Sequence, residues 1–217
     1  MRSINIFGIT GGIGYHFFKE IVKSEIDICG FYHNNHDLAN RIKKERSGIT
    51  LKRVDLSRNF AFKEIIIPNY ECLLYVAGKY HFSKNIFDFS ERDLETHMNI
   101  NINSLFVILQ RLCSYDNLTL KKVVVVSAMY PLVINSLYHT VKRLQDEFLE
   151  ILKPTLNDKQ IGLSIIKVGW VNTNMYKEYM RITGKTVKKV IEPDIVAKCC
   201  LEEFEQNQRF NVREVKS

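Results

Sequence analysis

Short apolar runs alternate along the whole chain with segments in which apolar residues recur at helical spacing. Each run predicts a strand, and its nearly continuous apolar character indicates burial on both faces, as in a parallel sheet covered by helices. The seven predicted strands span Ser3–Ile9, Ile26–Tyr32, Ile49–Val54, Cys72–Ala77, Lys121–Ser127, Ile161–Val168 and Phe210–Val215.

Segments of helical periodicity separate these strands. The predicted helices span Ile13–Ser24, Asp37–Arg46, Phe60–Ile67, Glu91–Ser114, Asn135–Leu152 and Asp194–Glu205. Pro68 ends the third helix, the fifth ends near Pro154, and Pro193 favours the start of the last. Strands that alternate with helices predict an α/β fold of the Rossmann type: a doubly wound, seven-stranded, mainly parallel sheet flanked by helices on both faces.

The length of the chain suits one such domain. With 217 residues, two full domains would be cramped. No internal repeat, low-complexity stretch or linker interrupts the pattern, so residues 1–217 are expected to form a single domain. The segment Asn172–Glu192 is polar, basic and weakly periodic, which makes it the candidate for a flexible insertion.

The chain is basic, with 31 Lys and Arg against 24 Asp and Glu and a formal net charge of +7. The basic residues are scattered in pairs such as Lys43–Lys44 and Lys188–Lys189, and no long basic run interleaves with aromatic residues. The charge therefore indicates a solvated surface, and nucleic acid is not an expected partner. No apolar run is long enough to span a bilayer, so no membrane partner is expected.

The cysteine and histidine residues indicate a cytoplasmic protein without a metal site. Five cysteines, an odd number, occur without a C-x-x-C pair, which fits a reducing cytosol. The six histidines show no metal-ligand pattern. No signal peptide is expected, because the first strand begins within a few residues of Met1.

A glycine-rich turn joins the first predicted strand to the first helix. Gly8, Gly12 and Gly14 give the spacing G-x-x-x-G-x-G, and no G-K-[ST] of a P-loop follows. Glycines allow a tight turn and a close approach of the backbone to a pyrophosphate, while the helix N-terminus offers free N–H groups. The pattern favours dinucleotide binding over a plain strand–helix turn.

The end of the second strand favours NADP(H) over NAD(H). An acidic residue there would hydrogen-bond the ribose 2′-hydroxyl of NAD and repel a 2′-phosphate. The sequence instead carries His33, Asn34 and Asn35, followed by Arg41. These neutral or basic groups leave room for the extra phosphate.

Tyr138 and Lys142 form a Tyr-x-x-x-Lys pair on the helix after the fifth strand. Residues four apart share one helix face. The pKa of free tyrosine is about 10, and a nearby ammonium favours the phenolate. The pair can therefore serve as a proton donor and acceptor, although without further context it would be an ordinary helix surface pair.

The order of these features resembles the short-chain dehydrogenase/reductase family over nearly the whole chain. Asp55, Ala77–Gly78, Asn101 and Val168–Thr173 match further motifs of the family. The resemblance implies that the cofactor is bound by Gly8, Thr10, Gly11, Gly12, Ile13, Gly14, His33, Asn34, Asp55, Leu56, Ala77, Gly78, Asn101, Tyr138, Lys142, Gly169, Val171 and Thr173.

The resemblance also implies the reaction, a hydride transfer between NAD(P) and a small carbonyl/alcohol pair. Tyr138 would be the general acid in reduction and the general base in oxidation. Lys142 would hold the ribose hydroxyls and lower the pKa of Tyr138, and Ser127 would hydrogen-bond the substrate oxygen. Asn101 would anchor a water in the proton relay, and Thr173 would bind the nicotinamide carboxamide.

Several residues depart from the family pattern. Phe7 replaces a threonine before the first glycine, and Tyr75–Val76 replaces paired asparagines. Ser127 is followed by Ala128, and the interval to Tyr138 is short for the family. A deletion in that interval would keep Ser127 as the catalytic serine, which we favour; in strict register Ala128 takes its place and the hydroxyl is missing.

Two other functions stay open. The departures are compatible with a cofactor-binding protein of little or no catalysis, serving as a regulator or partner subunit. An isomerase or dehydratase on the same scaffold is the third possibility. By analogy with the family, we expect a homodimer through the helices Glu91–Ser114 and Asn135–Leu152.

The sequence also gives predictions for three neighbours of the motif residues. Asn99 and Asn103 flank Asn101, so a shift in register would exchange their roles. His139 is expected to point away from Tyr138, since helix neighbours diverge by about 100°.

The segment Asn172–Glu192 is the expected substrate loop. Its basic residues, Arg181, Lys185, Lys188 and Lys189, suit an acidic or phosphopantetheine-bearing substrate, but a solvated loop is the favoured interpretation.

Overall fold

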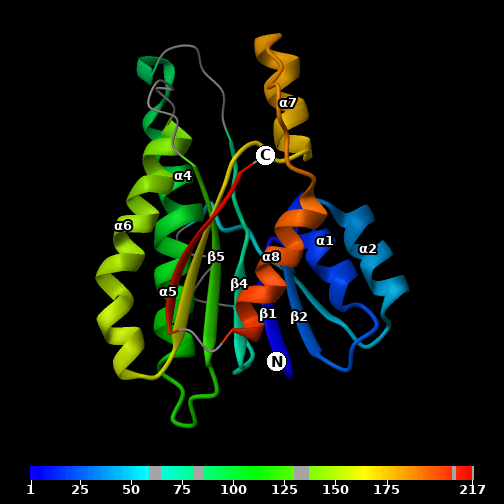
Figure 1. Ribbon diagram of the computed structural model, residues 1–217, viewed down its shortest axis with the longest axis vertical. Coiled ribbons are helices and arrows are strands. Elements are labelled where there is room, and N and C mark those ends of the chain that lie inside the picture. Colours follow the sequence, from blue (N-terminus) through cyan, green and yellow to red (C-terminus); the bar gives the residue numbers. More distant parts are fainter. Residues whose placement is uncertain (59–64, 81–85, 130–136, 207–208, 217) are drawn as a thin grey trace.

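Seven strands form one parallel sheet at the centre of the molecule (Figure 1). They are β1 (Ser3–Phe7), β2 (Asp27–Tyr32), β3 (Thr50–Arg53), β4 (Cys72–Tyr75), β5 (Lys122–Ala128), β6 (Gly162–Val168) and β7 (Phe210–Val215). Their order is β3-β2-β1-β4-β5-β6-β7. The computed structural model describes residues 1–58, 65–80, 86–129, 137–206 and 209–216. Over these residues the predicted doubly wound α/β fold is confirmed, with every adjacent strand pair parallel.

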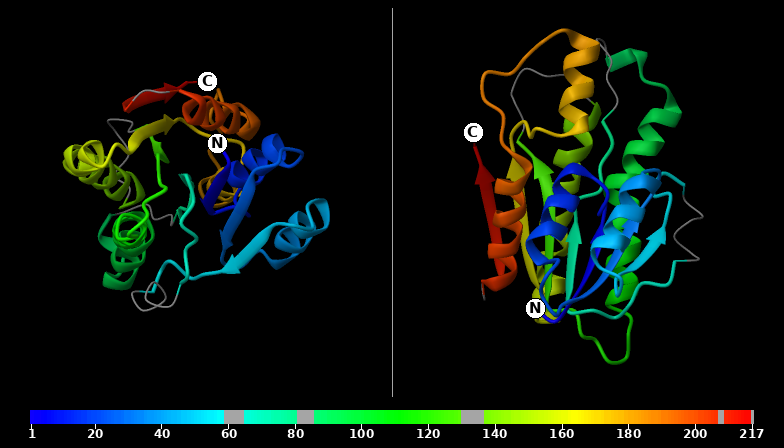
Figure 2. Two further views of the ribbon diagram at one scale, coloured as in Figure 1. Left: turned by 90° about the horizontal axis from the view of Figure 1, so that it is seen from below. Right: turned by 90° about the vertical axis from the view of Figure 1, so that its right-hand side faces the viewer.

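Helices cover both faces of the sheet (Figure 2). One face carries α1 (Gly12–Ile21), α2 (His36–Glu45) and α8 (Pro193–Glu205). The other carries α4 (Glu91–Met98), the π-helical turn η2 (Asn99–Asn103), α5 (Ser104–Leu112) and α6 (Leu137–Asp158), with the short helix η1 (Ile86–Asp88) before α4. Helix α7 (Asn174–Thr183) lies beyond the carboxyl ends of the strands (Figure 1).

The central strands are buried on both sides, as the continuous apolar runs predict. In β5, Val123 and Val125 pack toward α5 and α6, whereas Val124 and Val126 pack toward α1 and α8. All four valines are buried. Successive side chains of a strand point to opposite faces, so a run of valines supplies both cores at once.

Two predicted segments differ from the structure. Helix α6 continues through Pro154 to Asp158. A proline in a helix removes one backbone hydrogen bond, and the buried Leu156 packs the last turn against the core. The predicted flexible insertion Asn172–Glu192 contains helix α7, which ends at Gly184 in the left-handed conformation, with φ of 66°. Most of the predicted helix Phe60–Ile67 lies outside the described residues.

The sheet places a crevice between the carboxyl ends of β1 and β4, where the strand order reverses. The chain leaves β1 through Gly8, whose φ of 94° suits glycine. A Cβ atom at Gly8 would lie 2.9 Å from the Ala77 amide nitrogen, so only a glycine fits between the two strand ends. Ligands of open α/β sheets bind at such reversals, which makes this crevice the place to look for a site.

Candidate functional site

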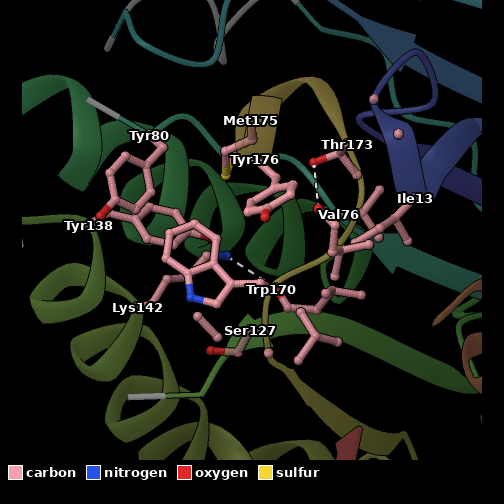
Figure 3. Close-up of a pocket in the computed structure, with 18 of the residues that line it drawn as sticks. Ile13, Val76, Tyr80, Ser127, Tyr138, Lys142, Trp170, Thr173, Met175 and Tyr176 are labelled. Atoms are coloured by element: carbon pink, nitrogen blue, oxygen red, sulfur yellow. Dashed lines mark hydrogen bonds between the residues drawn. The ribbon is translucent and has the colours of Figure 1, made fainter. Parts of the chain in front are cut away.

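A cavity of about 570 Å³ lies at the carboxyl ends of β1, β4, β5 and β6 (Figure 3). It brings together most of the site residues predicted from the sequence. Those that line it are Thr10, Gly11, Gly12, Ile13, Ala77, Gly78, Ser127, Tyr138, Lys142, Gly169, Val171 and Thr173. The remaining predicted residues lie in the adjoining turns, at the ends of β2 and β3, or behind the cavity wall.

The glycine turn brings the start of α1 to one side of the cavity. The Gly11 amide donates to the Gly8 carbonyl at 2.8 Å, and α1 begins at Gly12. A Cβ atom at Gly12 would lie 2.4 Å from Cγ2 of Thr173, and one at Gly14 would lie 2.2 Å from the Gly8 oxygen. The turn therefore excludes side chains at these positions and presents bare backbone N–H groups, which fits the diphosphate of a dinucleotide.

Four of the predicted cofactor-binding residues, His33, Asn34, Asp55 and Leu56, lie just after the ends of β2 and β3. Asp55 is paired with Arg58 at 3.2 Å and with His33 at 3.5 Å, and it accepts hydrogen bonds from the amide and hydroxyl of Ser57. Burial raises the pKa of Asp55, but these hydrogen bonds and charges outweigh it and hold the pKa below its usual range. The Arg53 side chain donates to the His33 carbonyl at 3.2 Å, so this end of the crevice is basic.

Asn34 is exposed at the tip of β2, and Leu56 is buried beside Asp55. Leu56 packs into the core on the α5 side of the sheet. The two residues therefore differ in what they can offer a ligand: Asn34 has a free polar surface, whereas Leu56 is mainly a packing residue.

Tyr138 and Lys142 lie on the same face of α6 and both line the cavity. The Lys142 Nζ is 6.0 Å from the centroid of the Tyr138 ring. Lys142 is only 2% exposed, and burial lowers its pKa to about 8, although Asp146 opposes this shift. Burial, together with nearby Tyr80, raises the pKa of Tyr138. The hydroxyl of Tyr138 therefore keeps its proton in the cofactor-free protein.

The alternation of β5 side chains separates the two candidates for the serine position. Val123 and Val125 point to the α6 side of the sheet, so Ser127 shares that side with Tyr138 and Ala128 points to the other. Both Ser127 and Ala128 line the cavity, and Ser127 is 2% exposed. The geometry therefore favours Ser127 as the hydroxyl nearest the Tyr138 side of the cavity.

Gln145, which sequence reasoning missed, connects Lys142 to Asn101. Its Oε1 accepts from the Lys142 Nζ at 2.9 Å, and its Nε2 donates to the Asn101 carbonyl. The Lys142 Nζ also donates to the Val126 carbonyl at 3.1 Å. Gln145 and Asn101 are both fully buried. A polar residue on the inner face of α6, one turn after Lys142, is the signal by which Gln145 could have been found.

Asn101 lies in the π-helical turn η2, and its neighbours of the same type serve other contacts. The Asn99 side chain donates to the Ser57 carbonyl at 2.9 Å, and the Asn103 side chain donates to Asn99 at 2.7 Å. Of the three asparagines, Asn101 is the one whose carbonyl accepts from Gln145. The structure thus brings Asn101, rather than Asn99 or Asn103, into the network around Lys142.

Two departures from the family pattern are accommodated beneath the glycine turn. The Phe7 ring stacks on Phe31 with centroids 4.0 Å apart, and Tyr75 lies 6.0 Å from Phe7. The Tyr75 hydroxyl donates to the Ile100 carbonyl and lies 2.6 Å from the Ser104 hydroxyl. Tyr75 therefore ties β4 to the π-helical turn, because its hydroxyl bonds a backbone carbonyl of η2.

His139 contradicts its expected orientation. Its ring centroid is 5.5 Å from that of Tyr138 and 5.9 Å from that of Tyr80, and it lines the cavity. The Tyr80 ring packs against both side chains, so both line the cavity although helix neighbours diverge around the helix axis. Burial lowers the pKa of His139, which favours the neutral ring.

The chain matches the family model described as short chain dehydrogenase over residues 2–182. No curated protein sequence shows significant similarity to it. Many solved structures share its fold. No helix among the described residues is long and apolar enough to cross a membrane.

Three of the similar solved structures illustrate the likeness in fold. Serine dehydrogenase with NADP⁺ is 15% identical at a TM-score of 0.83, covering 98% of this chain and 94% of its own. 4-Hydroxyisoleucine dehydrogenase with NADH is 15% identical at 0.81, covering 99% and 97%. A short-chain dehydrogenase from Sphingobium yanoikuyae with NADPH is 17% identical at 0.78, covering 98% and 87%.

The burial of Lys142 predicts a pH dependence of stability. The pKa of Lys142 is about 8 in the folded protein and returns to its usual value of 10.5 on unfolding. The unfolded chain therefore binds more protons between these values, so this group adds stability as the pH rises. We expect the free energy of unfolding of the wild type to rise by about 3 kcal/mol relative to Lys142→Met from near pH 8 to pH 10.5, measured by urea denaturation.

The hydrogen bonds lost in Lys142→Met change its free energy of unfolding by an amount that does not depend on pH. The prediction therefore concerns only how the difference from the wild type changes with pH. Lys177→Met, which removes an exposed ammonium, serves as the control. A difference between wild type and Lys142→Met that stays constant with pH would contradict the buried, charged state of Lys142.

Proposed function

This chain belongs to the short-chain dehydrogenase family, and we propose that it is an NAD(P)-dependent oxidoreductase that reduces a carbonyl or oxidises an alcohol. The observation that carries the proposal is one cavity lined by Ser127, Tyr138 and Lys142 and closed on its other side by the glycine turn. The three solved structures described above carry NADP⁺, NADH and NADPH, respectively. Both the catalytic side chains and the cofactor turn thus face the same space.

The residues present fit a nicotinamide dinucleotide. The backbone amides of Gly12 and Ile13, at the N-terminus of α1, would hold its diphosphate, and Thr173 lies beside Gly12 where the nicotinamide half would pass. When bound, the cofactor supplies or accepts the hydride. Everything else in the reaction, from orientation of the substrate to movement of the proton, falls to side chains of this chain.

Tyr138 moves the proton in this mechanism. In reduction its hydroxyl donates to the carbonyl oxygen as the carbonyl carbon gains a hydride, and an alcohol results. Its raised pKa keeps the hydroxyl protonated for this direction. In oxidation it must accept the proton instead, and the Lys142 ammonium on the same helix face stabilises the phenolate. The Ser127 hydroxyl would hydrogen-bond the substrate oxygen.

Gln145 acts in the mechanism as a positioning residue for Lys142. An ammonium has three donors, and two of them are bonded to the Val126 carbonyl and to Gln145. The third is left for the cavity that Lys142 lines, where a ribose hydroxyl would accept it. Gln145 also donates to the carbonyl of Asn101, the residue expected to anchor a relay water, so it links Lys142 to that residue.

We place the protein in the cytoplasm on the state of its cysteines. All five are free, and four of them are buried. Reduced cysteines of this kind suit a reducing compartment.

Tyr138→Phe tests the reaction. The variant keeps the ring but removes the proton donor, so we expect NADPH to bind as in the wild type while carbonyl reduction falls at least about a hundredfold. NADPH binding is followed by nicotinamide fluorescence and turnover by NADPH absorbance over a panel of carbonyl compounds. Undiminished turnover would refute the role of Tyr138. Tight NADPH binding with no turnover in the wild type would instead favour a cofactor-binding protein without catalysis.

The basic end of the crevice predicts a preference for NADPH over NADH. Arg53 and Arg58 flank His33 and Asp55, and a 2′-phosphate would gain charge-assisted hydrogen bonds there. Replacing both arginines by glutamine is expected to weaken NADPH binding about tenfold and to leave NADH binding nearly unchanged. Arg209→Gln, just before β7, is the control. Equal losses for both cofactors would remove the basis for the preference.

We propose that the protein forms a homodimer through α5 and α6. Phe106, Leu144 and Ile151 are large apolar side chains exposed on these helices, with Ile151 74% exposed. Covering them would remove apolar surface from water. Leu144→Glu with Ile151→Glu is expected to convert a dimer to a monomer in sedimentation equilibrium, whereas Ile195→Glu on α8 should not. A monomeric wild type at micromolar concentration would exclude the dimer.

A further inference from the structure

Aromatic side chains from four separate segments meet around the cavity. Tyr80 follows β4, Tyr138 lies in the first turn of α6, Trp170 follows β6 and Tyr176 lies on α7. Ring centroids are 4.9 Å apart for Tyr80 and Tyr138, and 6.4 Å apart for Tyr80 and Trp170. Figure 3 shows these three rings together on one side, with Tyr176 beside them and Ile13 and Val76 on the far side. Rings and alkyl groups thus form opposite walls of the cavity, which Ser127 and several other polar side chains also line.

Contacts with neighbouring residues hold two of these rings, Trp170 and Tyr176, in place. Trp170 is backed by Tyr179, with ring centroids 4.4 Å apart, and by Tyr176 at 5.8 Å. The Tyr176 hydroxyl accepts a hydrogen bond from the Val187 amide at 3.2 Å. Tyr176 is only 7% exposed. A wall fixed in this way loses little conformational freedom when a flat ligand packs against it.

Apart from the glycine turn, which is assigned to the cofactor, the same cavity offers little to a charged ligand. Among the described residues that line it, Lys142 is the one lysine or arginine, and neither aspartate nor glutamate occurs. Lys142 is already bonded to the Val126 carbonyl and to Gln145. A carboxylate substrate would lose its hydration without gaining a dedicated partner, and a cationic substrate would meet the Lys142 ammonium.

The basic residues of α7 and the segment after it do not change this balance. Arg181 is paired with Glu178 at 2.7 Å, and neither residue lines the cavity. Lys185, Lys188 and Lys189 are likewise outside the described cavity wall. They therefore give no support to the acidic substrate considered from the sequence.

From these features we propose that the substrate is a neutral carbonyl compound with a planar aromatic ring system. The ring lies against Trp170 and Tyr80, and the carbonyl oxygen reaches Tyr138 and Ser127. Ring pairs of this kind are favoured over burial of equal apolar area without π-systems. This assignment rests on the proposed function, because the same cavity must hold the reacting carbonyl.

Trp170 provides the measurement, because it is the only tryptophan of the chain. Three matched probes are titrated into the full-length protein: acetylnaphthalene, its saturated counterpart acetyldecalin, and an acetylnaphthoate that carries a carboxylate. Binding is measured by calorimetry and by quenching of Trp170 fluorescence. Titrations are made without cofactor and with NADP⁺, which cannot reduce a ketone. Turnover with NADPH is assayed separately.

We expect acetylnaphthalene to quench Trp170 and to bind about three- to tenfold more tightly than either acetyldecalin or the acetylnaphthoate. Tyr80→Leu should remove this advantage while keeping the Trp170 signal. Tyr115→Leu, beyond the end of α5 and outside the cavity, should leave it unchanged.

Acetyldecalin or the acetylnaphthoate binding as tightly as acetylnaphthalene would overturn the assignment, and so would binding that leaves Trp170 unquenched. Failure of the proposed function gives a different result. In that case acetylnaphthalene binds and quenches as expected, but no carbonyl compound consumes NADPH.

Discussion

The pairing of β1 with β4, where the order of strands reverses, is the constraint on which the site depends. After β1 the chain continues toward β2, whereas after β4 it continues toward β5. The two connections therefore run to opposite sides, and a crevice opens between them. Gly8 allows the two strand ends to approach closely, since a Cβ atom at this position would meet the Ala77 amide. The glycine turn, the Ala77–Gly78 segment and the start of α1 take their positions from this contact.

Burial of the Lys142 ammonium costs free energy that the protein must offset with hydrogen bonds. An ammonium out of water needs acceptors, and here they come from the Val126 carbonyl of β5 and from Gln145. Gln145 in turn donates a hydrogen bond to the Asn101 carbonyl in the π-helical turn. Asp146, which favours the charged form of Lys142, is itself paired with Lys167 of β6 at 3.1 Å. Strand β5, helix α6, the π-helical turn and the cavity are thus linked through the ammonium of Lys142.

Residues that break the family pattern form a consistent core of their own. Phe7, Phe31 and Tyr75 stack beneath the glycine turn, where the family carries smaller polar residues in two of the positions. The Tyr75 hydroxyl reaches the Ile100 carbonyl, and the Ser104 hydroxyl bonds the same carbonyl at 2.8 Å. The Tyr75 and Ser104 hydroxyls thus satisfy a backbone carbonyl of the π-helical turn, and Phe7 packs against the Tyr75 ring.

The sequence by itself determined the fold class and the order of the elements along the chain, and it identified Gly8, Tyr138 and Lys142 as candidate site residues. Periodicity and glycine spacing are local properties, and local properties are visible along a chain. Most predicted strand bounds agree with the observed ones within a few residues. The helix in Asn172–Glu192 was not predicted, because its periodicity is weak and Tyr176 is buried only through tertiary packing.

Only the tertiary structure decided which side chains share the cavity. The side of the sheet to which Ser127 points follows from the alternation of β5, yet that side could be identified only once α6 was packed against it. Gln145, Tyr80 and the inward position of His139 depend on contacts between segments far apart in the sequence. Such contacts are set by burial and hydrogen bonding in three dimensions, and no spacing along the chain encodes them.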